Sequence, residues 1–128
     1  MKTKIAVIDD EAPIQQMYKM RLELAGYEVA TAGDGENGLR LIQSFKPALI
    51  LLDLRMPHMS GDEMLEKLRA TEDGAAIKVI ILTNISKDEA PRALRLLHVD
   101  RYVVKAHHTP QQITEIIGEV LGKFPEKA

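Results

Sequence analysis

Five polar side chains in this sequence stand at the ends of short apolar runs and are of types that could do chemistry together. Asp9 and Asp10 follow the first run, Asp53 follows the third, Thr83 follows the fourth and Lys105 follows the fifth. The carboxyl ends of parallel strands lie at one edge of a sheet, and ligands bind there where the strand order reverses. If the runs are such strands, three carboxylates, one hydroxyl and one ammonium group should converge.

Three converging carboxylates favour a bound cation, because like charges destabilise one another in the ionised form. A hard divalent ion with oxygen ligands relieves this repulsion, and Mg²⁺ is the usual choice where phosphates are handled. Lys105 can neutralise one carboxylate when no metal is bound. With both cations present, one aspartate could attack phosphorus and form an acyl phosphate, while Lys105 and Thr83 surround the transferred charge.

The spacing of apolar residues predicts the elements that hold these side chains. Four of the five runs are nearly continuous, as in strands buried on both faces of a parallel sheet, whereas the second contains a charge and suits an edge. The runs cover residues 5–8, 27–30, 48–52, 79–82 and 102–104, and helical spacing appears over 14–25, 64–68 and 113–124. Thr109 and Pro110 suit the N-cap and first position of the last helix. This alternation predicts five β-α units in a three-layer α/β fold with a doubly wound parallel sheet.

The segment before the fifth run leaves its helix start open to two interpretations. Ser86 and Glu89 have the spacing of a capping box, but a helix capped at Ser86 would hold Pro91 at its fifth position, at a cost of about 3 kcal/mol. A helix capped at Asp88 would hold Pro91 at its third position, where proline costs little. We therefore predict that this fourth helix begins late, at Asp88.

Residues 33–38 match the glycine spacing of a dinucleotide-binding fingerprint. The match follows the second strand, however, and Asp34 and Glu36 would repel a pyrophosphate. We expect an ordinary turn in which Asp34 caps the next helix.

The composition of the chain limits its domain number, its chemistry and its partners. The chain has 128 residues, 45% of them hydrophobic and 28% charged, with a net charge of −2 and no cysteine. These values favour one folded domain over residues 1–128, with a core at about 4–124, and exclude disulfides, thiolate zinc sites and cysteine nucleophiles. No apolar stretch approaches the roughly 20 residues of a membrane span, and we expect a soluble, cytoplasmic protein with no membrane partner. The near-neutral charge and few aromatic residues argue against direct nucleic-acid binding.

The order and spacing of these residues resemble the receiver domains of two-component response regulators, over about residues 4–124. The matching features are the pair Asp9-Asp10, the segment 51–57 around Asp53, Gly61 eight residues beyond it, Leu82-Thr83, and Tyr102 three residues before Lys105. Five such features in order are highly specific. The resemblance implies a flavodoxin-like sheet with strand order 2-1-3-4-5.

The resemblance also implies a set of site residues. Asp53 would accept a phosphoryl group from a histidine kinase or a histidine phosphotransfer protein. Asp10, Asp53 and the backbone carbonyl of Arg55 would hold Mg²⁺, and Asp9 would assist directly or through water. The domain would then be a phosphorylation-controlled switch that catalyses its own phosphorylation and dephosphorylation.

Further implications concern signalling. Thr83 and Lys105 would contact the phosphoryl group, and Tyr102 and Thr83 would move together on activation. The signal would pass to a downstream protein through the face formed by the fourth helix, fifth strand and fifth helix. The chain would be a monomer or a weak homodimer.

Two positions depart from the family pattern. Asn84 follows Thr83, where relatives usually have a small residue, and Ala106 follows Lys105, where relatives usually have a proline in a cis peptide. A cis bond before a residue other than proline costs about 2.5–4 kcal/mol, so the sequence leaves open whether this loop is cis or takes a trans path.

Two other classes of protein compete with the switch. A Mg²⁺-dependent phosphatase or phosphotransferase for small molecules could use the same aspartate, but it would need a cap or a substrate pocket, and we expect no insertion that could build one. Arg55 also stands where the usual Asp-x-Asp motif of such enzymes has its second aspartate. A binding module without phosphorylation is disfavoured by the complete acidic, threonine and lysine set.

Overall fold

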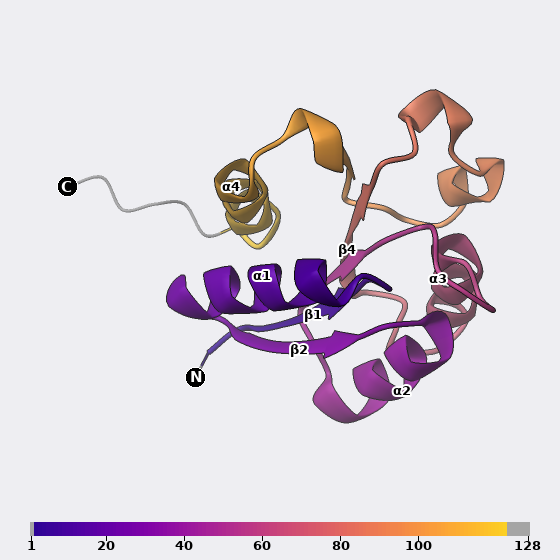
Figure 1. Cartoon of the computed structure of the whole chain (residues 1–128). Helices are drawn as coiled ribbons and strands as arrows, with labels where there is room; N and C mark the ends of the chain where they lie inside the picture. The colour runs from indigo at the N-terminus through magenta and orange to yellow at the C-terminus, as the bar shows by residue number, and fades with distance from the viewer. Residues whose placement is uncertain (1, 123–128) are drawn as a thin grey trace.

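The computed structural model describes residues 2–122 and contains one parallel sheet with helices on both faces (Figure 1). Its strands are β1 (Lys4–Ile8), β2 (Glu28–Ala32), β3 (Leu49–Leu52), β4 (Lys78–Thr83) and β5 (Arg101–Val104). The α-helices are α1 (Ala12–Leu24), α2 (Gly35–Phe45), α3 (Gly61–Arg69) and α4 (Pro110–Val120). Short 3₁₀-helices η1 (Lys87–Glu89), η2 (Arg92–Arg95) and η3 (Lys105–His107) complete the elements. No helix among these residues is long and apolar enough to cross a bilayer.

The sheet has the strand order β2-β1-β3-β4-β5, with all neighbours parallel, which confirms the predicted fold class. The second run is an edge strand, as its internal charge indicated. The chain passes from β1 to β2 on one side and then returns to β3 on the other side of β1. The strand order therefore reverses between β1 and β3, where open α/β sheets bind ligands.

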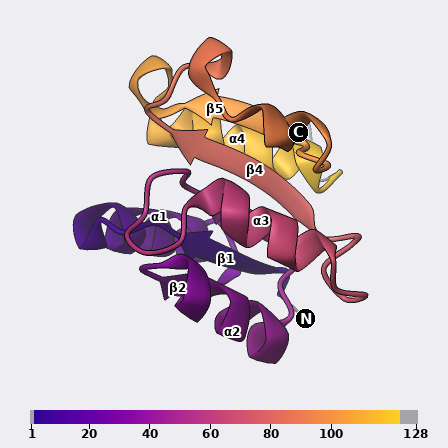
Figure 2. The same ribbon diagram turned by 90° about the vertical axis from the view of Figure 1, so that its right-hand side faces the viewer.

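Both faces of the sheet are covered, which explains why its central strands are apolar throughout. Ile5 and Val7 of β1 point into the core beneath α1 and α4, whereas Ala6 and Ile8 point into the core beneath α2 and α3. Figure 2 shows the two helix pairs on opposite faces. Alternate residues of one strand thus enter different cores, so each face requires its own apolar residues.

Two predicted helix starts are confirmed by their capping contacts. The Asp34 carboxylate accepts a hydrogen bond from the Asn37 amide at 2.7 Å, so Asp34 caps α2, and residues 35–38 form the first turn of that helix. Thr109 and Gln112 form a capping box at the start of α4, with Pro110 at its first position. Phe124, predicted to continue the apolar stripe of α4, lies outside the described residues.

The predicted fourth helix beginning at Asp88 is wrong. The connection from β4 to β5 contains only η1 and η2, separated by the extended residues Ala90 and Pro91. A proline disfavours the α conformation of the residue before it, and Ala90 accordingly has φ −65° and ψ 148°. Pro91 therefore divides the segment instead of lying within a helix, and the expectation of five β-α units is corrected to four α-helices among the described residues.

Candidate functional site

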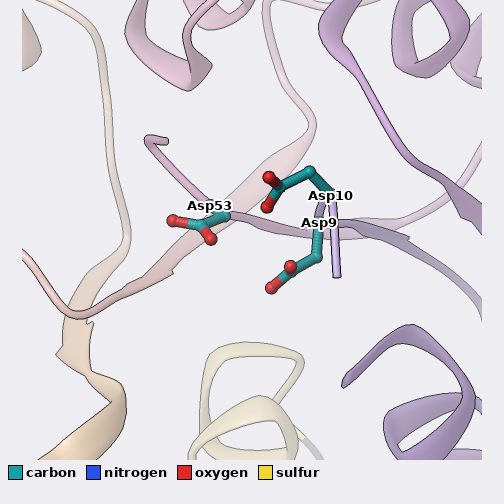
Figure 3. A group of neighbouring side chains, drawn as sticks. All are labelled: Asp9, Asp10 and Asp53. Carbon is teal, nitrogen blue, oxygen red and sulfur yellow. The ribbon is translucent and has the colours of Figure 1, made fainter. Parts of the chain in front are cut away.

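Three carboxylates and one lysine meet at the reversal of strand order. Asp9 and Asp10 follow β1 and Asp53 follows β3, and each offers a carboxylate oxygen within 4.8 Å of the others (Figure 3). Lys105, directly after β5, places its Nζ 2.7 Å from Asp9 Oδ2 and 3.1 Å from Asp53 Oδ2. The predicted convergence of these four side chains is therefore present.

The two buried carboxylates are held in the same way. Asp9 Oδ1 accepts a hydrogen bond from the Glu11 amide at 2.9 Å, and Asp53 Oδ1 accepts one from the Arg55 amide at 3.2 Å. Each carboxylate thus accepts a backbone amide hydrogen bond on one oxygen and contacts Lys105 Nζ with the other. Asp9 and Asp53 are buried, whereas Asp10 is exposed at the mouth of the site.

The electrostatics of the site reflect this crowding. Burial raises the pKa of the Asp9 carboxyl, an effect that its contacts with Lys105 and the Glu11 amide only partly offset. Burial by itself lowers the pKa of Lys105, but its contacts with Asp9 and Asp53 outweigh burial and raise that pKa above its ordinary value. Lys105 is therefore charged at neutral pH and is the cation of the site.

The donor set fits a hard divalent cation. Three carboxylates and one ammonium leave a net formal charge of two negative units. Asp10 has no hydrogen bond or ion pair to another described residue, so its oxygens are free for a ligand. Carboxylate oxygens of this kind are the ligands that Mg²⁺ takes in phosphate-handling sites.

Thr83 and Tyr102 both contact the loop that follows β4. Thr83 is buried at the end of β4, and its Oγ1 accepts a hydrogen bond from the Ile85 amide at 3.4 Å. The Tyr102 hydroxyl donates to the Ile85 carbonyl at 2.7 Å. Ile85 thus joins both side chains to one loop, and their joint movement remains a prediction.

The peptide between Lys105 and Ala106 is trans, which resolves the alternative that the sequence left open. β5 runs directly into η3, and Lys105 still reaches both buried carboxylates. The departure from proline at position 106 therefore does not direct the lysine away from the site.

Comparison with known proteins identifies the family. A family model for the response regulator receiver domain matches residues 5–118. The chain belongs to the response regulator receiver family. Receiver domains act in two-component signalling, and the acidic cluster, Thr83 and Lys105 lie at the ends of the receiver strands.

Individual relatives agree with this assignment. The receiver domain is 40% identical over 123 residues to a probable transcriptional regulator ycf27 of Cyanophora paradoxa, covering 95% of this chain and 49% of the relative. It is 36% identical over 121 residues to the phosphate regulon transcriptional regulatory protein PhoB of Pseudomonas aeruginosa. This match covers 93% of this chain and 52% of PhoB. The chain thus spans about half the length of the curated relatives it matches.

Among solved structures, the chemotaxis response regulator CheY4 of Vibrio cholerae superposes with a TM-score of 0.85. The two chains are 28% identical, and the match covers 94% of this receiver domain and 99% of CheY4. Such coverage leaves little of either chain outside the shared fold.

Gly61 has a structural role that its motif did not explain. A Cβ atom at Gly61 would lie far inside van der Waals distance of the backbone oxygen of Asp53. We expect Gly61→Ala to lower the free energy of unfolding by about 1–3 kcal/mol and to displace Asp53, because the obstacle is backbone that cannot rotate away. Urea unfolding measures the loss. In Gly38→Ala the new Cβ meets only side-chain atoms of Ile8 and Met64 at 3.0 Å or more, so an equal loss in that control would contradict this explanation.

Two residues near the acidic cluster were missed as site residues. In the sequence, Tyr18 falls within the helical spacing of residues 14–25, and Gln15 matches no functional pattern. Tyr18 is buried, and its hydroxyl lies near enough to Lys105 and Asp9 for their charges to affect its pKa. The only feature of the sequence that indicated a role for Gln15 was its polar side chain at the start of the helix that follows the acidic pair.

Tyr18 gives the receiver domain a sensitivity to alkaline pH. Burial raises the pKa of Tyr18 from 10.0 to about 12, because the folded state favours the neutral phenol. The corresponding stability is present below pH 10 and is lost as pH rises toward 12. We expect Tyr18→Phe to show a shallower fall in unfolding free energy across this window in urea titrations. Identical pH slopes in both proteins would count against this role.

Proposed function

We propose that this receiver domain is a switch that accepts a phosphoryl group on Asp53 in a Mg²⁺-dependent reaction. The observation that carries the proposal is the buried Asp53 carboxylate, which shares Lys105 with Asp9 and lies within reach of Asp10 at the reversal of strand order. A nucleophile, a compensating cation and a set of metal ligands are the parts that phosphoryl transfer to a carboxylate requires.

The contact lengths favour Asp53 over Asp9 as the acceptor. The oxygens of Asp9 lie 2.9 Å from the Glu11 amide and 2.7 Å from Lys105 Nζ, whereas those of Asp53 lie 3.2 Å from the Arg55 amide and 3.1 Å from Lys105 Nζ. The longer contacts make an Asp53 oxygen easier to release for attack. Asp10, exposed and without such contacts, suits a metal ligand better than a fixed nucleophile.

In the proposed reaction an Asp53 carboxylate oxygen forms a bond to phosphorus while the bond from phosphorus to the donor breaks. For a phosphohistidine donor, the leaving imidazole nitrogen keeps the bonding electron pair. Lys105 then balances charge on the phosphoryl oxygens, and the Thr83 hydroxyl can donate to one of them. A divalent cation held by Asp10, Asp53 and the Arg55 carbonyl, with Asp9 beside it, would supply further positive charge. Hydrolysis reverses the change, as water attacks phosphorus and the carboxylate leaves.

The phosphoryl group would come from a partner protein, and the signal would leave the domain through one face. A histidine kinase or histidine phosphotransfer protein would supply the phosphoryl group, and the output face would comprise η1, η2, β5 and α4. Tyr102 supports this choice, because its hydroxyl ties β5 to the loop after Thr83. A shift from 1:99 to 99:1 between two states would need about 5.5 kcal/mol of differential affinity.

Incubation with a small-molecule phosphodonor tests the proposal. We expect intact mass spectrometry to show a gain of one phosphoryl group in the presence of Mg²⁺ and little gain after chelation of the metal. Equal labelling with and without the metal would contradict the role of the acidic cluster.

The competing small-molecule phosphatase finds no support. Such an enzyme needs a cap or a substrate pocket, and the match to CheY4 covers 94% of this chain, which leaves little room for an inserted segment of that kind. The comparisons also point to regulators and not to phosphatases.

A further inference from the structure

The side chain of Gln15 bridges two strand ends beside the acidic cluster. From the first turns of α1, its Nε2 donates hydrogen bonds to the Asp9 carbonyl at 2.5 Å and to the Ala32 carbonyl at 3.3 Å. The Ala32 carbonyl also accepts from the Asp9 amide at 3.1 Å. One side-chain amide thus joins the ends of β1 and β2 where their regular pairing stops at Ile8 and Ala32.

The Asp9 carbonyl belongs to the peptide that links the two acidic residues. Fixing this oxygen fixes the plane of the Asp9–Asp10 peptide, and hence the direction in which Asp10 leaves the backbone. The Asp9 side chain has its own partners in Glu11 and Lys105, but the Asp10 side chain has none among the described residues. The backbone is therefore what aims Asp10 at the site, and Gln15 holds that backbone.

We propose that Gln15 is a positioning residue for the metal site and sets the affinity of the receiver domain for Mg²⁺. It touches no carboxylate and is not itself a ligand; it acts through the Asp9–Asp10 peptide. Only a side chain with N–H donors can serve two carbonyl oxygens in this way. The proposal rests on the proposed function, because it assumes that the acidic cluster binds Mg²⁺.

The test compares Gln15→Leu with Gln16→Leu. Both replace a glutamine by a residue of similar size on α1, but Gln16 is exposed, and its side chain has no hydrogen bond to a strand end among the described residues. We expect Gln15→Leu to weaken Mg²⁺ binding by about 10-fold or more, within the range for residues that orient metal ligands, and Gln16→Leu to bind as the parent does. Isothermal titration calorimetry measures the dissociation constants.

A second readout separates positioning from general stability. The rate of phosphorylation should recover in Gln15→Leu at saturating Mg²⁺, because the catalytic groups Asp53 and Lys105 are unchanged. If Gln15→Leu does not fold, Gln15→Asn keeps an amide that is one methylene shorter and should still show weakened Mg²⁺ binding.

Three outcomes would overturn the inference. If the folded Gln15 variants bind Mg²⁺ as tightly as the parent, or stay slow at saturating Mg²⁺, the positioning role is wrong while the proposed function stands. If the parent itself does not bind Mg²⁺, the proposed function fails and this inference fails with it.

Discussion

Asp53→Asn is expected to gain no phosphoryl group under conditions that label the parent receiver domain. The amide keeps the size of the carboxylate but carries no negative charge and is a poor nucleophile, so attack on phosphorus should fall by at least about 100-fold. Fold and burial should be retained, because the amide side chain would fill the same space at the end of β3. Intact mass spectrometry after incubation with phosphodonor and Mg²⁺ measures the difference.

Asp73→Asn is the matched control for this variant. Asp73 is an exposed aspartate after α3, so its replacement makes the same chemical change away from the acidic cluster. It should be labelled like the parent. Labelling of Asp53→Asn at the parent rate would show that another side chain accepts the phosphoryl group.

Lys105→Met is expected to destabilise the metal-free protein by about 3 kcal/mol, the low end of the cost of removing one partner from a buried ion pair. Lys105 lies between the carboxylates of Asp9 and Asp53, and its loss leaves both without a cation. Urea unfolding at neutral pH measures the loss. Mg²⁺ should restore part of it by supplying the missing positive charge.

The pH dependence of this loss has a definite sign. The raised pKa of Lys105 means that its contribution is present below pH 10.5 and is lost only as pH rises through its folded value. Burial raises the pKa of Asp9, so the folded state without Lys105 gains relative stability as pH falls toward 3.8 and this carboxyl protonates. The deficit of Lys105→Met should therefore shrink in acid. Lys87→Met, at an exposed lysine of η1, should change stability by less than about 0.5 kcal/mol.

The central strands and the position of the site could be predicted because they depend on local patterns. Continuous apolar runs require cover on both faces of a sheet, and the residues after such runs necessarily meet at one edge of it. This reasoning brought Asp9, Asp53 and Lys105 together from positions far apart in the sequence, and the two contacts of the lysine with the carboxylates agree with it.

Other features depend on contacts that no local pattern encodes. The predicted helix around Pro91 was wrong because Pro91 favours an extended conformation at Ala90, which interrupts a helix there. The sequence does not indicate the role of Gln15, because its partners are backbone carbonyls and folding alone brings the carbonyl of Ala32 in β2 beside it. The close approach of Gly61 to Asp53 is likewise a property of the folded loop.

Borohydride trapping is the most direct test of Asp53 as the phosphoryl acceptor. Borohydride reduces an acyl phosphate to an alcohol, so an aspartyl phosphate becomes homoserine and can be located by peptide mass spectrometry. After incubation of the receiver domain with phosphodonor and Mg²⁺, we predict homoserine at position 53 and none at positions 9 or 10. Homoserine at position 9 or 10 in place of position 53, or labelled protein with no reduced aspartate, would contradict the role of Asp53 as acceptor.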